Sequence, residues 1–422
     1  MDNRNKHIST IIFAIILPFW TLIASIRFFK SPTAKNWFWY ACAFMGYIFI
    51  FNPIGSTGSE TDADSSRIAQ SLQEMHSNPM NFETVSTYFY SEEGSLDIYQ
   101  ELIVFILSRF TTNAHYLFLI FAIIFGYFYS RNIWIITSYT NSDKQSWYIW
   151  IVLIMFFLIN PIWQINGGRM WIALHVFMYG LFSFYLNNDK KKIIWCFLSV
   201  LIHFSFLLPL VLILIYQFLP KKSLTIYFIL YFVAISMAEI KIQPLKEALI
   251  TFLPAQLSSK AESYMNEDSV QAAIDRNASY SLYLVMASKM ARYFVLIFIA
   301  YFWVNFKKLF QVQLYQNLLA LFLFLATIFE VLSVIPSMGR FLLITNMIFY
   351  SLLLLLLFDK KLTEDAIKVP TKYLSLLLIL PVLLSIRLGL EYYGATLFYG
   401  NFFSSTFIED RKPLIGFLKS FL

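Results

Sequence analysis

The stretch KIIWCFLSVLIHFSFLLPLVLILIYQFL (residues 192–219) decides the class of fold, because it is apolar over almost its whole length. A helix that crosses a bilayer needs about 20 mostly apolar residues, and this run exceeds that. The chain of 422 residues as a whole has the same character, since 59% of it is hydrophobic and only 14% is charged. A soluble domain carries roughly a quarter charged residues, so the sequence predicts an integral membrane protein.

Further apolar runs on both sides of this stretch predict an all-α, polytopic protein with about 11–12 transmembrane helices, some of them broken or re-entrant. The segment LDIYQELIVFILSRF (96–110) is too short and too charged for a span and is interpreted as interfacial or re-entrant. Residues 1–422 are expected to form a single polytopic membrane domain, whose first run is a retained span. The predicted runs lie near 8–28, 36–54, 115–137, 146–160, 169–187, 192–219, 223–240, 284–305, 313–335, 340–358 and 371–390.

The charges of the loops predict sidedness, because Lys and Arg accumulate on the cytoplasmic side of a membrane. Residues 55–100 form an acidic loop that we expect outside, and residues 241–289 form a second external loop. The carboxylates of the first loop are Glu60, Asp62, Asp64, Glu74, Glu83, Glu92, Glu93 and Asp97, against one cation, Arg67. The basic loops expected inside contain Lys30, Lys35, Lys144, Lys190, Lys191, Lys192, Lys221, Lys222, Lys307, Lys308 and the stretch 360–372.

One pair of these basic loops conflicts with a simple crossing pattern. Lys192 and Lys221 flank the same apolar run, so an ordinary span over 192–219 would place them on opposite sides. A re-entrant pair of half-helices, with His203 and Pro209 near the turn, removes the conflict because proline disrupts a helix interior. A single tilted helix with one loop that violates the charge rule is the alternative, and the sequence leaves both open.

Two arginines occupy similar positions, each after a glycine and before an apolar run. Arg169 lies in NGGRMWIALHVF (166–177) and Arg340 in SMGRFLLITNMIF (337–349), and both are expected at the outer face. A guanidinium stays charged and binds phosphate oxygens through two N–H groups at once. The pair therefore predicts an external clamp for a diphosphate, whereas the simpler interpretation makes both arginines interfacial anchors.

Other polar residues are weaker candidates. His203 lies deep in an apolar run, where ionisable groups are usually functional or paired, and could act as a general base with Asp64 in reserve. Candidates for contact with a saccharide or phosphate are Asp62, Arg67, His175, Lys260, Tyr264 and Arg276.

Motif searches exclude several classes of function. The chain has no Walker motif, no G-x-G-x-x-G, no H-E-x-x-H and no Cys-rich metal site, so no cofactor and no metal are expected. The net charge of +7 comes from short loops between apolar runs and does not indicate nucleic-acid binding.

The order of these features resembles the EpsG-like, or Wzy-like, polymerases of bacterial surface polysaccharides. The similarity covers about residues 50–360 and rests on the acidic loop, on the arginine-led GGRMWIAL, on LIHFSFLLPL and on MGRFLL. The acidic stretch TDADSSRIAQ departs from the family pattern, in which tyrosines follow an aspartate.

This resemblance implies a GT-C-like integral glycosyltransferase in the bacterial cytoplasmic (inner) membrane, with an active site that faces the periplasm. It also implies that donor and acceptor are oligosaccharide units carried on undecaprenyl diphosphate. A chain-length regulator and a flippase are the implied protein partners. Alternatives are an O-antigen-type ligase that uses the same donor and, from another class, a flippase or transporter of lipid-linked oligosaccharides.

Overall fold

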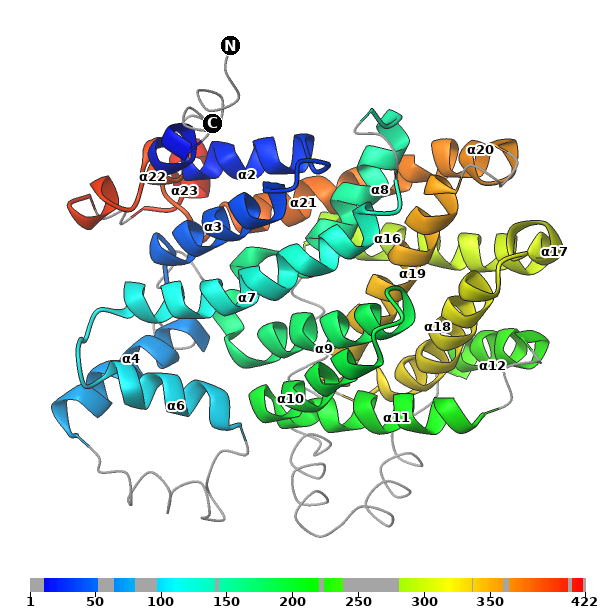
Figure 1. Cartoon of the computed structure of the whole chain (residues 1–422), viewed down its shortest axis with the longest axis horizontal. Coiled ribbons are helices and arrows are strands. Elements are labelled where there is room, and N and C mark those ends of the chain that lie inside the picture. Colours follow the sequence, from blue (N-terminus) through cyan, green and yellow to red (C-terminus); the bar gives the residue numbers. More distant parts are fainter. Residues whose placement is uncertain are drawn as a thin grey trace, which may run out of the picture. The chain divides into compact units, whose positions relative to one another are not determined.

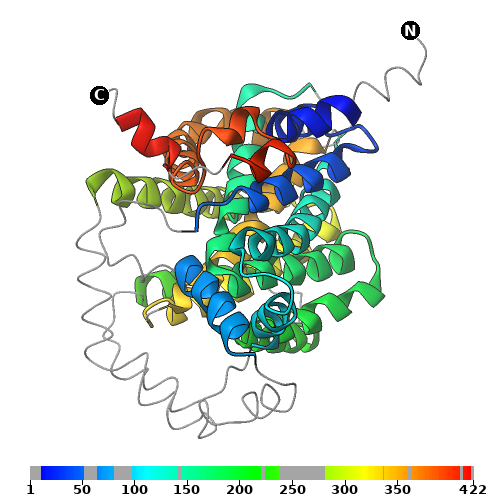
Figure 2. The same ribbon diagram turned by 90° about the vertical axis from the view of Figure 1, so that its left-hand side faces the viewer.

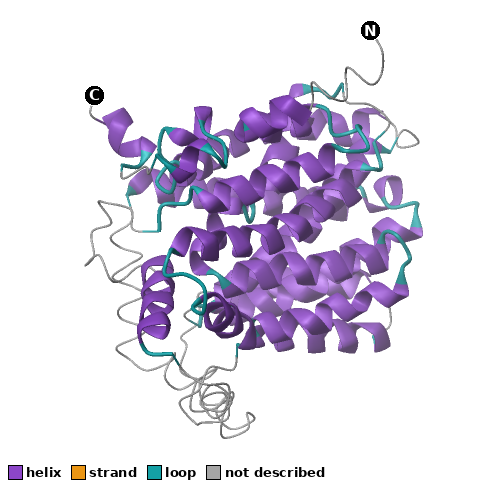
Figure 3. Cartoon of the chain, turned by 60° about the vertical axis from the view of Figure 1, so that its left-hand side comes forward, coloured by secondary structure: helices purple, strands orange, loops and turns teal. Residues whose placement is uncertain are grey.

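The computed structural model describes residues 11–51, 64–79, 97–140, 144–219, 224–237, 281–335, 337–359, 364–408 and 412–419. In this part of the chain, all regular structure is helical and no strand is present (Figure 3). The described residues fall into two compact units. Unit 1 is Met1–Gln145, Asn160–Leu210 and Ser385–Leu422, and unit 2 is Ser146–Ile159 and Val211–Leu384.

Unit 1 is built around helices that lie side by side in the order α2, α3, α7, α9 and α10 (Figure 1). α4 and α6 pack against each other (Figure 2). α4 also contacts η1, and α6 also contacts α10. The bounds are α2 (Pro18–Arg27), α3 (Ala34–Tyr47), α4 (Asp64–Ser77), α6 (Ile98–Leu107), α7 (Ala114–Thr137), η1 (Ile162–Gly167), α9 (Arg169–Tyr185), η2 (Lys190–Ile193), α10 (Ile194–Ile202), η3 (Phe204–Phe206), α22 (Thr396–Tyr399), η6 (Ser404–Thr406) and α23 (Leu414–Lys419).

Small residues allow the central helices of unit 1 to approach closely. A Cβ on Gly46 of α3 would lie 2.1 Å from the Cβ of Ala122, and one on Gly126 of α7 would lie 2.6 Å from the Cβ of Cys42. Small residues at helix interfaces are how membrane helices associate, because lipid offers no hydrophobic drive between apolar surfaces. The α3–α7 contact is therefore set by backbone proximity, and α9 packs on α7 in turn.

In unit 2, α18 lies between α12 and α19, α19 also contacts α8, and η5 packs against α8 and α16. The bounds are α8 (Trp147–Leu158), α12 (Leu224–Met237), α16 (Leu282–Val304), α17 (Phe306–Leu309), α18 (Gln313–Leu332), η4 (Met338–Phe341), α19 (Leu342–Phe358), α20 (Glu364–Leu374) and η5 (Ser375–Leu378). The remaining helices, α11 (Leu207–Phe218) and α21 (Ile379–Gly389), each contain a boundary between the units.

The helices confirm an all-α, polytopic membrane protein. Among the described residues, six helical segments are long and apolar enough to cross a bilayer, and each coincides with a predicted run. They are Ala114–Thr137, Trp147–Gly167, Leu282–Val304, Gln313–Leu332, Met338–Phe358 and Ala366–Gly389. Where the structure describes them, the other predicted runs form shorter helices. In the 96–110 segment, the helix is the ten-residue α6. That the whole chain is one membrane domain stays a prediction.

The long apolar run 192–219 is broken, as one of the two interpretations of the sequence requires. α10 ends at Ile202, His203 is extended (φ −148°, ψ 112°), and η3 leads into α11. The break thus falls at His203, and Pro209 lies in the first turn of α11, where a missing N–H removes no intrahelical bond. A single continuous helix is excluded, and the return of the second half to the same side of the membrane stays a prediction.

Candidate functional site

Arg169 is placed by the glycine that precedes it. Gly168 has φ +56° and ψ −87°, which lets the chain turn from η1 directly into α9, so that Arg169 is the first residue of that helix. A Cβ at Gly168 would lie 3.2 Å from both Gln100 Oε1 and Ile68 Cδ1, which come from α6 and α4. The GGR sequence therefore brings a guanidinium and a sharp turn close to the two helices of the acidic loop.

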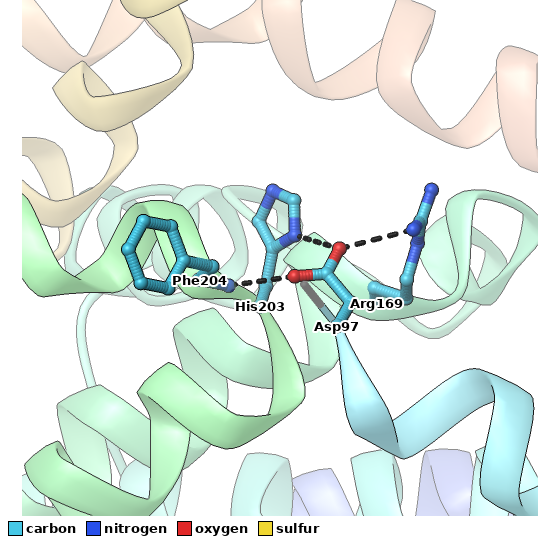
Figure 4. Close-up of polar contacts among 4 residues, drawn as sticks. All are labelled: Asp97, Arg169, His203 and Phe204. Carbon is cyan, nitrogen blue, oxygen red and sulfur yellow. Dashed lines mark hydrogen bonds and ion pairs between the residues drawn. The ribbon is translucent and has the colours of Figure 1, made fainter. Parts of the chain in front are cut away.

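Asp97 contacts both Arg169 and His203, two of the residues that the sequence singled out. It directly precedes α6, and only 8% of its side chain is exposed. Its Oδ2 lies 2.7 Å from Nδ1 of His203 and 3.0 Å from the guanidinium of Arg169 (Figure 4). Its Oδ1 accepts a hydrogen bond of 2.7 Å from the backbone N–H of Phe204. One carboxylate therefore binds an imidazole, a guanidinium and the start of a helical turn.

The charge state of Asp97 follows from these contacts. Burial by itself raises the pKa of a carboxyl group. Here the hydrogen bond and charge of His203, the N–H of Phe204 and the charge of Arg169 outweigh burial and lower the pKa of Asp97 below its usual range. Because an ionised carboxylate can only accept, Nδ1 of His203 carries the hydrogen in this contact.

The tautomer of His203 then decides what the ring can do. In the neutral imidazole a hydrogen on Nδ1 leaves Nε2 as an acceptor, and Figure 4 shows that nitrogen pointing away from Asp97. About a quarter of the side chain (23%) is exposed, whereas 36% of that of Arg169 is exposed. A base oriented by a buried carboxylate, next to an accessible cation, is an arrangement suited to proton removal near a negatively charged group.

Asp64 and Arg67 lie near this cluster but form their own ion pair. Both are on the first turn of α4, and both side chains are more than half exposed. A Cβ at Gly167 would lie 4.0 Å from Oδ2 of Asp64, so this carboxylate is close to the turn that carries Arg169. The structure thus puts Asp64 beside the cluster and puts Asp97 inside it.

His175 lies within unit 1 and is 1% exposed. Its Nε2 is 2.9 Å from the carbonyl oxygen of Asn160, Nδ1 is 3.3 Å from the amide nitrogen of Asn132, and the ring packs on Phe125 and Tyr129. These contacts support a packing role, and contact with a substrate stays a prediction.

Arg340 belongs to unit 2, so the predicted clamp that it forms with Arg169 stays a prediction. The two glycine-arginine motifs also differ locally. Gly339 and Arg340 lie inside the short η4 turn, where Ser337 is the residue with positive φ (+70°), and α19 begins two residues later. The candidates Asp62, Lys260, Tyr264 and Arg276 lie outside the described residues.

Sequence reasoning missed Asp97. It was one of eight carboxylates in the acidic loop. Its position immediately before an apolar run that is too short to cross a membrane was the available signal. A polar residue at such a helix start is often there to accept backbone or side-chain hydrogens.

Comparison with known proteins agrees with the resemblance found in the sequence. The EpsG family matches residues 79–403, a segment that contains Asp97, Arg169, His203 and Arg340. No curated protein and no solved structure matches the chain. The match covers well over half of the 422 residues, and the chain therefore belongs to the EpsG family, whose members are membrane proteins of the polysaccharide-polymerase type.

Proposed function

We propose that this protein is a glycosyltransferase that polymerises oligosaccharide repeat units carried on undecaprenyl diphosphate, at the outer face of the bacterial cytoplasmic membrane. The observation that carries the proposal is the Arg169–Asp97–His203 cluster, which combines a base with a cation inside the segment that matches the family. The outward orientation rests on the charges of the loops.

His203 is the general base of the proposed reaction. Nε2 removes the proton from a hydroxyl of the acceptor, while Asp97 holds the ring and stabilises the imidazolium that forms. The same division of labour between an imidazole and a buried carboxylate operates in Ser-His-Asp enzymes. Asp64 remains the reserve base, because it lies beside the turn that carries Arg169.

Arg169 acts on the leaving group. The acceptor oxygen forms a bond to the anomeric carbon of the donor chain, and the bond from that carbon to the diphosphate oxygen breaks with its electron pair. Undecaprenyl diphosphate leaves with the additional negative charge. The guanidinium of Arg169 stabilises this charge as it develops in the transition state more strongly than it stabilises the bound donor. Arg340 is proposed as a second ligand of the same diphosphate.

Reconstitution with a synthetic lipid-linked repeat unit tests this proposal. Purified protein in liposomes is incubated with the repeat unit alone, and products are resolved by size. A ladder of products supports polymerisation, and the same ladder should be absent from the Asp97→Asn and His203→Ala variants. A Glu74→Gln variant is the matched control, since that exposed carboxylate accepts a hydrogen bond from Gln70 on the same helix, α4, and lies outside the cluster.

Other outcomes decide between the alternatives. A single adduct on an added lipid acceptor, without a ladder, identifies a ligase. Movement of the repeat unit across the vesicle membrane without any new glycosidic bond identifies a transporter. Either outcome contradicts the proposed polymerase.

A further inference from the structure

A polar cavity in unit 1 is lined by residues that do not belong to the Asp97 cluster. It has a volume of about 480 Å³, which is within the range of pockets that hold small ligands. Its lining includes four cationic side chains, those of Lys30, Lys35, Arg131 and Lys192, and one carboxylate, that of Asp189. We call this space the basic cavity.

The cations of the basic cavity come from four places in the chain that packing brings together. Lys30 follows α2, Lys35 is in the first turn of α3, Arg131 is in the second half of α7, and Lys192 is in η2. The helices that position them are neighbours within unit 1. Cations gathered around one space repel one another, and a bound anion offsets that repulsion.

The single carboxylate does not neutralise this set. Oδ1 of Asp189 accepts a hydrogen bond of 3.2 Å from the backbone N–H of Lys191 and so caps η2. Arg131 is held by Asn36, through a 2.9 Å bond to its Oδ1, and its guanidinium lies 4.1 Å from the centre of the Tyr127 ring. The cavity therefore keeps a positive excess with at least one cation fixed in position.

A buried hydroxyl adds an independent observation. Thr137 lines the cavity, is 1% exposed, and its Oγ1 has no hydrogen-bond partner in the part of the chain that the structure describes. An unpaired buried hydroxyl is unfavourable, so a ligand that can accept a hydrogen bond is expected there. Phosphate oxygens are acceptors, and Ser183 and Asn187 supply further donors around the same space.

Aromatic side chains indicate where this ligand comes from. Phe29, Trp134 and Tyr179 also line the cavity, and Nε1 of Trp134 donates to the carbonyl oxygen of Phe29 at 2.8 Å. Trp and Tyr concentrate at the depth of lipid headgroups, and basic pockets between membrane helices on the cytoplasmic side bind anionic headgroups. Lys30, Lys35 and Lys192 all belong to loops whose charge predicts the cytoplasmic side.

We propose that the basic cavity binds a phosphate group, that of an anionic phospholipid headgroup in the inner leaflet. Lys35, Lys192 and Arg131 provide the positive charge, and Thr137 donates its hydroxyl hydrogen to a phosphate oxygen. The proposal does not depend on the polymerase reaction, because none of these residues belongs to the Asp97 cluster.

Binding of phosphatidylglycerol to the purified, full-length protein tests the proposal. The protein in mixed micelles is titrated with phosphatidylglycerol or with phosphatidylcholine, and bound lipid is counted by native mass spectrometry. The basic-cavity variant combines Lys35→Gln with Lys192→Gln. The matched control combines Lys307→Gln with Lys308→Gln, which changes two exposed lysines of α17. Each lysine removed from the cavity should weaken phosphatidylglycerol binding about fivefold, and the control pair should leave it unchanged.

Further variants and ligands complete the test. Lys35→Arg with Lys192→Arg should restore binding, which separates lost charge from lost folding. A soluble glycerol phosphate that competes with the lipid at equal concentration supports the phosphate site but assigns it to a free phosphate ester. The proposal is overturned if the basic-cavity and control variants lose phosphatidylglycerol binding equally. It is also overturned if the protein binds phosphatidylcholine as well as it binds phosphatidylglycerol.

Discussion

Nδ1 of His203 lies 2.7 Å from Oδ2 of Asp97, although 106 positions separate the two residues in the chain. The contact joins the start of α6 to the break between α10 and α11. It gives the imidazole of His203 a fixed orientation.

Replacement of Asp97 by asparagine should abolish most of the polymer-forming activity. An amide nitrogen can donate to Nδ1, which favours the opposite tautomer and removes the acceptor from Nε2. The loss is expected to be on the order of 10²–10⁴-fold, the range for a base that loses its orientation. Initial rates of ladder formation in liposomes measure it, and a variant with near-normal rates would remove Asp97 from the mechanism.

Arg169→Ala and Arg340→Ala should each abolish polymer while the protein still inserts in the membrane. Lysine at either position should restore activity only partly, because an ammonium group cannot bind two phosphate oxygens with a planar fork. Polymer length on gels and membrane-fraction blots provide the two readouts, with Arg27→Ala in α2 as an exposed arginine control. Normal polymer lengths in both alanine variants would contradict the clamp.

Gly168→Ala should destabilise the turn into α9. The positive φ of +56° is unfavourable for alanine by about 1–2 kcal/mol, and the added Cβ would crowd Gln100 and Ile68 at 3.2 Å. A lower unfolding temperature in detergent and a loss of activity are expected together. Gly416→Ala is the matched control, since a Cβ there meets no atom within 4 Å, and an equal effect of both changes would show that the turn is not the cause.

The Asp97 cluster predicts a specific pH dependence. Because contacts in the folded protein lower the pKa of Asp97, its stabilising contribution is fully present above the unfolded value of about 3.9 and is lost as the pH falls through the lower, folded value. Unfolding temperatures should therefore fall more steeply below about pH 4 in the wild type than in Asp97→Asn. Equal acid slopes in the two proteins would be inconsistent with a lowered pKa of Asp97.

Glu330→Gln should destabilise unit 2 by removing the partner of a cation in the middle of α16. Glu330 is 8% exposed and lies 3.0 Å from the guanidinium of Arg292, which is 47% exposed. Loss of one member of such a pair is expected to cost about 1–3 kcal/mol, less than for a fully buried pair. Thermal unfolding measures the change, and the double variant Arg292→Leu with Glu330→Leu should recover much of it. No recovery in the double variant would show that the two residues act separately.

Much of the fold follows from the sequence because lipid imposes a simple rule. Backbone groups in the membrane must be satisfied within a helix, so long apolar runs become helices with little ambiguity. The charge conflict between Lys192 and Lys221 left a broken helix and a single tilted helix open, and in the structure the run is broken at His203.

The site followed less fully from the sequence. Arg169 and His203 stood out because charged or ionisable groups are rare next to apolar runs. Asp97 did not, because its role depends on contacts that only packing creates: α6 lies beside α10, and the turn at Gly168 brings Arg169 to the same place. Asp64 was predicted as the reserve base because it lies in an acidic stretch, yet it forms an ion pair with Arg67, three residues away.

The hydrogen bond from Phe204 N–H to Asp97 has a consequence for genetics. One carboxylate both begins the helical turn after the break and orients the imidazole next to it, so a mutation at Asp97 should disturb the backbone turn and the proposed base simultaneously. Suppressors that restore only the helical turn, for instance by a new acceptor near Phe204, should recover folded protein without recovering polymer. Selection for polymer should instead return an acidic side chain to the neighbourhood of position 97.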